Sequence, residues 1–134
     1  MRVLVDTSVW VDFLNGHDSP EKLTLAQLIE GEGDVCTCGV IVAEVFQGLR
    51  RESGRSELEA LFRELTFLDA PGVDPYLRAA ELYRGLRARG ITIRSTIDCL
   101  IAVLAEQAGC ALLTRDRDLE AIVDSGLLRL RLLD

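Results

Sequence analysis

The residues of this sequence that could do chemistry are acids placed beside or within apolar segments. Two short apolar runs, 3–5 and 111–113, are each followed closely by acids, and two longer apolar stretches each contain one acid. The carboxylates in question are Asp6, Glu44, Asp98, Asp116 and Asp118. An ionised carboxylate buried without a partner is costly, so such groups are paired, protonated or bound to a metal. Oxygen ligands of this kind suit hard divalent cations such as Mg²⁺ and Mn²⁺.

Most of these acids also have a local structural explanation. Asp6 could cap a helix that begins just after it, and Asp98 stands three residues after Ser95, which is the spacing of a capping box. Asp116 could open the helix that follows it, where acids are favoured by the helix dipole. Glu44 has no capping role, because it lies inside a helical stretch on an apolar face. One shared cation explains all of these positions together, and we favour it.

The chemistry expected of such a site is hydrolysis of a phosphodiester bond. Crowded carboxylates raise one another's pKa unless a cation is present. One or two bound cations would activate a water as the nucleophile and offset charge on the phosphate oxygens. The single histidine, His17, is remote in sequence, so no Ser–His or Cys–His pair offers itself. Products carrying 5′-phosphate and 3′-hydroxyl ends are expected.

Short apolar strands alternate with helices along the chain, which predicts an α/β fold with helices on both faces of a mainly parallel sheet. In such folds the ligand site lies at the carboxyl ends of the strands. The strands are expected at 2–5, 35–39, 66–70, 111–114 and 126–133. The helices are expected at 7–15, 21–30, 40–52, 56–65, 74–89, 95–109 and 117–126.

Composition limits the remaining possibilities. A length of 134 residues predicts one domain, 1–134. The net charge of −7 means that any nucleic acid must be met by a local basic rim. The four cysteines match no common zinc pattern and are expected to be buried free thiols. No apolar run is long enough to span a bilayer, and a cytoplasmic location is expected.

The order of the acids, in VDTSVW, VIVAEVFQGL, STIDCLIAVLA and LLTRDRDLEAI, closely resembles the PIN domain. More narrowly, the chain is similar to the VapC toxins of bacterial VapBC toxin–antitoxin modules. The resemblance covers essentially the whole chain. It implies a three-layer α/β/α fold with a five-stranded parallel sheet, Mg²⁺- or Mn²⁺-dependent endoribonuclease activity, a homodimer, and neutralisation by a VapB-type antitoxin.

The resemblance also implies roles for particular residues. The acidic quartet is Asp6, Glu44, Asp98 and Asp116. The metal ligands are drawn from Asp6, Asp98, Asp116 and Asp118, and either member of the Asp116–Asp118 pair could be the main fourth acid. The hydroxyl residues implied to support the carboxylates or the phosphate are Thr7, Ser95 and Thr114. Separately, Arg94, Arg115 and Arg117 flank the acids in sequence and are candidates to contact the RNA backbone. The one mild departure is Leu119, where an aromatic residue is common.

Other readings remain open. A PIN fold kept as a non-catalytic module for binding RNA or protein is the main alternative, although it would be expected to lose some of the acids. A response-regulator receiver domain fits poorly, because Lys22 is the only lysine. The amphipathic helix near Tyr76–Arg89 and the stripe Val9, Trp10 and Phe13 are candidate dimer or antitoxin contacts, with core packing favoured for most of these side chains.

Overall fold

The structure is a computed structural model that describes residues 1–31 and 33–133. Four parallel strands form one sheet in the order β3-β2-β1-β4. They are β1 (Arg2–Val5), β2 (Asp34–Cys38), β3 (Thr66–Leu68) and β4 (Ala111–Leu113). The predicted α/β class with a parallel sheet is therefore confirmed. All four strands point the same way, so the residues that follow them meet at one edge of the sheet.

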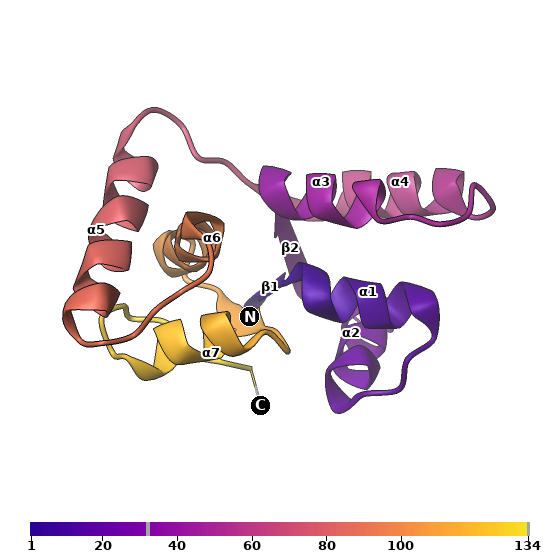
Figure 1. Cartoon of the computed structure of the whole chain (residues 1–134). Coiled ribbons are helices and arrows are strands. Elements are labelled where there is room, and N and C mark those ends of the chain that lie inside the picture. Colours follow the sequence, from indigo (N-terminus) through magenta and orange to yellow (C-terminus); the bar gives the residue numbers. More distant parts are fainter. Residues whose placement is uncertain (32, 134) are drawn as a thin grey trace.

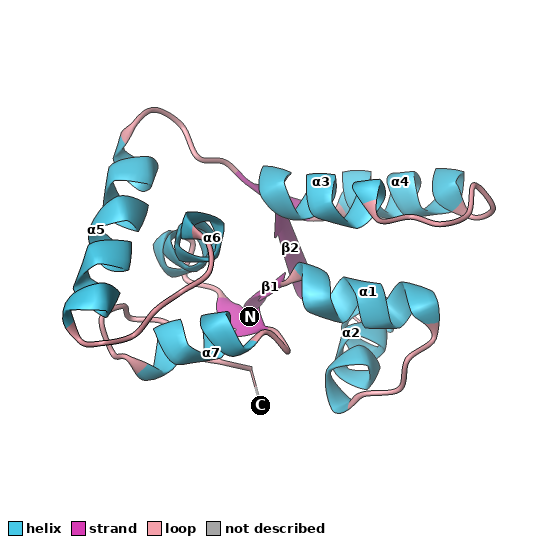
Figure 2. Ribbon diagram, viewed as in Figure 1, coloured by secondary structure: helices cyan, strands magenta, loops and turns pink. Residues whose placement is uncertain are grey.

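Seven helices surround the strands in the described part of the chain. They are α1 (Thr7–Asn15), α2 (Pro20–Glu30), α3 (Gly39–Gln47), α4 (Arg55–Glu64), α5 (Asp74–Ala88), α6 (Thr96–Gln107) and α7 (Arg117–Asp124). Figure 1 shows α5, α6 and α7 gathered on one side of the strands and α1 to α4 on the other. The secondary structure in Figure 2 places the strands between these two groups of helices.

The expected fifth strand, at 126–133, is reduced to a single parallel bridge between Leu112 and Leu132. The Leu112 N–H donates to the carbonyl of Arg131 at 3.0 Å, and the Leu133 N–H donates to the carbonyl of Leu112 at 2.8 Å. In a strand, the N–H and C=O groups of one residue point to the same neighbouring strand, and those of the next residue point to the other side. Because β4 has three residues and is paired with β1 on its inner side, only Leu112 faces outward. One bridge is all that this edge offers.

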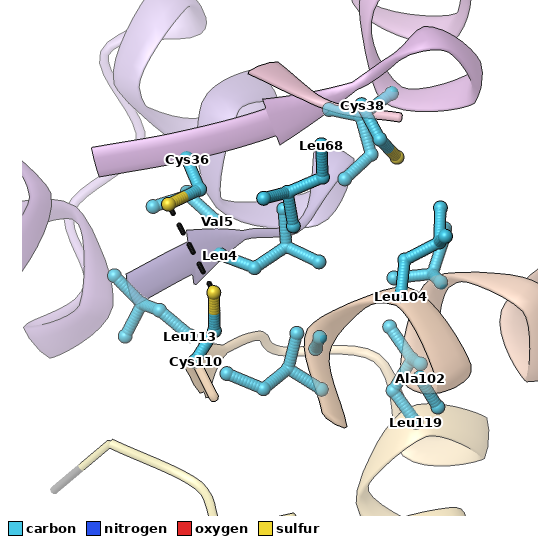
Figure 3. Close-up of a cluster of buried hydrophobic side chains, with 14 of the residues drawn as sticks. Leu4, Val5, Cys36, Cys38, Leu68, Ala102, Leu104, Cys110, Leu113 and Leu119 are labelled. Atoms are coloured by element: carbon cyan, nitrogen blue, oxygen red, sulfur yellow. Dashed lines mark hydrogen bonds between the residues drawn. The ribbon is translucent and has the colours of Figure 1, made fainter. Parts of the chain in front are cut away.

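The core lies around β1, whose residues Val3, Leu4 and Val5 are at most 1% exposed. Figure 3 shows side chains of β1, β2, β3, β4, α6 and α7 meeting here. The Cys110 thiol lies 3.9 Å from that of Cys36 in this cluster. Burial is the main cause that raises the pKa of Cys36 to about 12, so this thiol stays protonated. All four cysteines are free and buried, as the sequence predicted.

The apolar stripe of α1 packs into the core, as favoured above. Trp10 is fully buried, with its ring centroid 4.6 Å from that of Phe62 and 6.0 Å from that of Phe13. This packing fixes α1 and thereby the residue that precedes it, Asp6. In the part of the chain that the structure describes, no helix combines the length and the apolar character that crossing a bilayer requires.

Candidate active site

Asp6 joins the end of β1 to the start of α1. Its backbone N–H donates to the carbonyl of Leu113 at 2.9 Å, which ties it to β4. Its Oδ2 accepts three hydrogen bonds: from the Ser8 N–H at 3.2 Å, the Ser8 hydroxyl at 2.7 Å and the Thr114 hydroxyl at 3.1 Å. Asp6 is therefore the cap of α1 and also a carboxylate held in one orientation. It is 5% exposed.

Glu44 is positioned by a contact between two helices. The Thr7 hydroxyl on α1 donates to Glu44 Oε1 on α3 at 2.8 Å. Ile41 and Val45, which share the helix face of Glu44, are buried in the core. The core packing of α3 therefore directs the Glu44 carboxylate towards the first residue of α1, beside Asp6.

Three further carboxylates come together at the starts of α6 and α7. Asp98, Asp116 and Asp118 each place one oxygen within 4.8 Å of the others, and all three are half-buried. Asp116 caps α7: its Oδ1 accepts from the N–H groups of Asp118 at 2.8 Å and Leu119 at 3.2 Å. Asp116 Oδ2 takes no part in the cap and accepts a hydrogen bond from Arg94.

Arg94 reaches this carboxylate group from the segment that precedes α6. Its Nε and its backbone N–H donate to Asp118 Oδ2 at 2.9 and 3.1 Å, and its guanidinium donates to Asp116 Oδ2 at 3.3 Å. These hydrogen bonds lower the pKa of Asp118. Arg94, expected from the sequence to contact RNA, is engaged here with the acids.

The pKa of Asp98 reflects the charges of the other four acids of the site. Burial, which is the largest cause, and the negative charges of four neighbours together raise this pKa to about 7. Those neighbours, in order of effect, are Asp116, Asp6, Asp118 and Glu44. A cation beside Asp98 would remove this repulsion. The donor set consists of oxygens only, which fits a hard divalent cation.

In metal-free buffer we expect Asp98→Asn to stabilise the folded protein above pH 7. The unfolded chain loses this proton near pH 3.8 and the folded protein near pH 7, so the cost of ionising Asp98 appears as pH rises between them. The gain in unfolding free energy of the variant over the native protein should be absent at about pH 4 and complete above about pH 7. Allowing for solvent screening, we expect about 1–2 kcal/mol, or roughly 3–6 °C in melting temperature. Thermal melts in EDTA at both pH values test this, and an equal difference at both would contradict it.

Two residues of α1 that were not predicted as site residues, Ser8 and Asp12, hold Arg115 against α1. The Ser8 hydroxyl, besides donating to Asp6, accepts from the Arg115 N–H at 3.0 Å. Asp12, which is 6% exposed, accepts from the Arg115 guanidinium and from the Ser19 hydroxyl, the latter at 3.2 Å. Ser8 and Asp12 are four residues apart on one face of α1. That spacing of polar groups in an apolar helix was the available signal.

The predicted hydroxyl residues have different roles. Thr7 and Thr114 donate to the carboxylates of Glu44 and Asp6, as described above. Thr114 also accepts from the Asp116 N–H at 2.9 Å, so it links two of the acids. Ser95 instead caps α6 by accepting from the Ile97 N–H at 3.1 Å.

The family model and the similar sequences point to the same protein family. The PIN domain family matches residues 3–124. Ribonuclease VapC11 of Mycobacterium tuberculosis (strain ATCC 25618 / H37Rv) is 32% identical over 121 residues, which are 90% of each chain. VapC ribonuclease Mb1587 of Mycobacterium bovis matches with the same identity and coverage.

Solved structures show the same fold. VapBC-1 from nontypeable Haemophilus influenzae aligns with a TM-score of 0.70 at 18% identity, covering 100% of this chain and 98% of the other. VapBC2 from Rickettsia felis, bound to a DNA fragment from its promoter, aligns with a TM-score of 0.66 at 21% identity and full coverage of both chains. The chain therefore belongs to the PIN domain family and, within it, to the VapC ribonucleases.

Proposed function

We propose that this protein is the toxin of a type II toxin–antitoxin module and acts as an endoribonuclease that hydrolyses phosphodiester bonds of RNA. The observation that carries the proposal is the gathering of the Asp98, Asp116 and Asp118 carboxylates within 4.8 Å, with Asp6 and Glu44 near enough to raise the pKa of Asp98. The 32% identity with VapC ribonucleases, over 90% of the chain, supports the same activity.

The residues proposed to hold Mg²⁺, with Mn²⁺ as a substitute, are Asp6, Asp98, Asp116 and Asp118. A bound divalent cation would lower the pKa of a water and offset charge on the phosphate oxygens. Asp6 is suited to this role because three hydrogen bonds to Oδ2 fix its orientation. Outer hydrogen bonds of this kind orient carboxylates for a metal.

Glu44 is proposed to orient the attacking water. The Thr7 hydroxyl occupies its Oε1, which leaves the second oxygen to accept a hydrogen bond from that water. Arg94 is proposed to serve the RNA, because its exposed guanidinium lies beside the acids where a phosphate would bind.

Partners and location are proposed from the relatives. The similar structures include VapBC complexes, so we propose that a VapB-type antitoxin neutralises this protein and that it forms a homodimer. We propose that residues 1–134 form one PIN domain and that the protein acts in the cytoplasm. The choice of RNA target depends on the surface around the acids.

Cleavage of total cellular RNA by the purified protein, freed of antitoxin, tests the proposal. With Mg²⁺ or Mn²⁺ we expect discrete cuts, and with EDTA none. Asp124→Asn, which removes an exposed acid at the end of α7, is the matched control and should cut normally. If neither metal supports cutting while the protein still binds RNA, the non-catalytic RNA-binding module is the better description.

A further inference from the structure

A cavity of about 700 Å³ lies between the carboxyl end of α1, the carboxyl end of α3 and the 48–55 connection to α4. Its titratable lining side chains are His17, Arg50, Arg51 and Arg55. No acid from the described residues lines it, although the whole chain carries a net charge of −7. A cavity whose titratable lining side chains are all basic, in an acidic protein, indicates a site for an anion.

Two of these arginines are available to a ligand. Arg55 pairs with Glu52 at 3.3 Å and with Glu59 at 3.6 Å. Arg50 and Arg51 are exposed and form no ion pair with any residue that the structure describes. A guanidinium group can donate two parallel hydrogen bonds to one phosphate, and it is more weakly hydrated than an ammonium group.

Helices α1 and α3, which line the cavity, also carry Thr7 and Glu44 of the proposed active site. The Thr7–Glu44 hydrogen bond joins α1 to α3 near their amino ends. Leu14 of α1 and Gly48, which follows α3, line the cavity near their carboxyl ends. Seven residues of helix separate Thr7 from Leu14, which is about 10 Å, or roughly three stacked nucleotides. Figure 1 shows α1 and α3 leading away from the strands towards the connection between α3 and α4.

We propose that this cavity binds backbone phosphates of the RNA strand whose scissile phosphate lies at the acids, with Arg50 and Arg51 as the contacting residues. The inference rests on the proposed function and extends it to a second contact with the substrate. RNA is favoured over a protein partner because the titratable lining is basic throughout and because α1 and α3, which line the cavity, also carry Thr7 and Glu44 of the proposed active site. Val11 and Val45 add apolar surface to the lining.

The test uses Arg50→Gln/Arg51→Gln in the full chain, with Arg84→Gln/Arg87→Gln as the matched control. Arg84 and Arg87 are exposed on α5, so the control removes the same charge from another surface. In an Asp98→Asn background, binding of a fluorescein-labelled single-stranded RNA of about 12 nucleotides is measured over a range of KCl concentrations. Two lost phosphate contacts should reduce the slope of log K against log salt by about 1.4. The control should leave the slope unchanged.

Cleavage kinetics separate this inference from the proposed function. In the otherwise native chain, Arg50→Gln/Arg51→Gln should raise KM by about tenfold with kcat unchanged, because the contact is remote from the reacting atoms. Equal KM values and salt slopes in the two double variants, with metal-dependent cutting intact, would overturn the phosphate site and leave the nuclease standing. Loss of binding to a VapB-type antitoxin with RNA binding unchanged would also overturn it, by assigning the cavity to a protein. Melting temperatures of both double variants show whether either is misfolded, and the single variants Arg50→Gln and Arg51→Gln then give the same comparison.

Discussion

Asp98→Asn is expected to lower RNA cleavage by about 10³-fold, equivalent to about 4 kcal/mol of transition-state stabilisation. Asp98 is half-buried on α6. The negative charges of four neighbouring acids raise its pKa, namely Asp116, Asp6, Asp118 and Glu44. The amide keeps the shape of the side chain but removes the central negative charge, so the cation should bind more weakly. Single-turnover cleavage at saturating Mg²⁺, together with Mg²⁺ titration, measures both effects.

This loss of activity should accompany a more stable protein in metal-free buffer at pH 8, as argued above. The combination separates a functional carboxylate from a structural one, because a residue needed for folding would lose stability and activity together. Asp124→Asn is again the control. Cleavage by Asp98→Asn within about threefold of the native rate would contradict the assignment.

Arg115→Gln is expected to have the second large effect, a loss of about 2 kcal/mol in unfolding free energy. The substitution leaves the Asp12 carboxylate buried with the Ser19 hydroxyl as its remaining described partner. The value lies between those of exposed and buried pairs because the Arg115 side chain is 44% exposed. Urea denaturation measures the change. Activity should fall about tenfold, since Arg115 holds the segment that carries Asp116 against α1.

Arg117, two residues further along the chain, provides the control for this prediction. It is exposed and forms no ion pair with a described residue, so Arg117→Gln should change stability by less than about 0.5 kcal/mol. Adding Asp12→Asn to Arg115→Gln should recover part of the lost stability, because the uncompensated buried charge is gone. Equal effects of Arg115→Gln and Arg117→Gln would mean that the Asp12 contact stabilises nothing.

Much of the fold could be predicted from the sequence because its elements are locally encoded. Strand β4 is a short, wholly apolar run, β1 is apolar after Arg2, and α6 is a mainly apolar stretch that begins after the Ser95 cap. The fifth strand was not predictable in this way. Its alternating residues at 126–133 have the pattern of a strand, but pairing depends on the partner edge, where Leu112 alone faces outward.

The acids of the site were accessible to sequence reasoning because parallel strands and the helices that follow them converge at one edge. The contacts that arginines make with the acids could not be predicted from the sequence. Whether Arg94 faces RNA or carboxylates depends on the path of its loop, which brings it to Asp118. The link from Asp12 to Arg115 joins residues 103 positions apart, so no local pattern encodes it.

Product-end analysis of the cleaved RNA tests the central claim most directly. A water nucleophile activated at the carboxylates leaves a 5′-phosphate and a 3′-hydroxyl, and the reaction should require Mg²⁺ or Mn²⁺. Attack by the RNA's own 2′-hydroxyl would leave a 2′,3′-cyclic phosphate and a 5′-hydroxyl. We predict that the products carry 5′-phosphate ends, which can be ligated without further treatment, and that no such ends form in EDTA. Cyclic-phosphate ends formed in EDTA would contradict a metal-dependent hydrolase at these five acids.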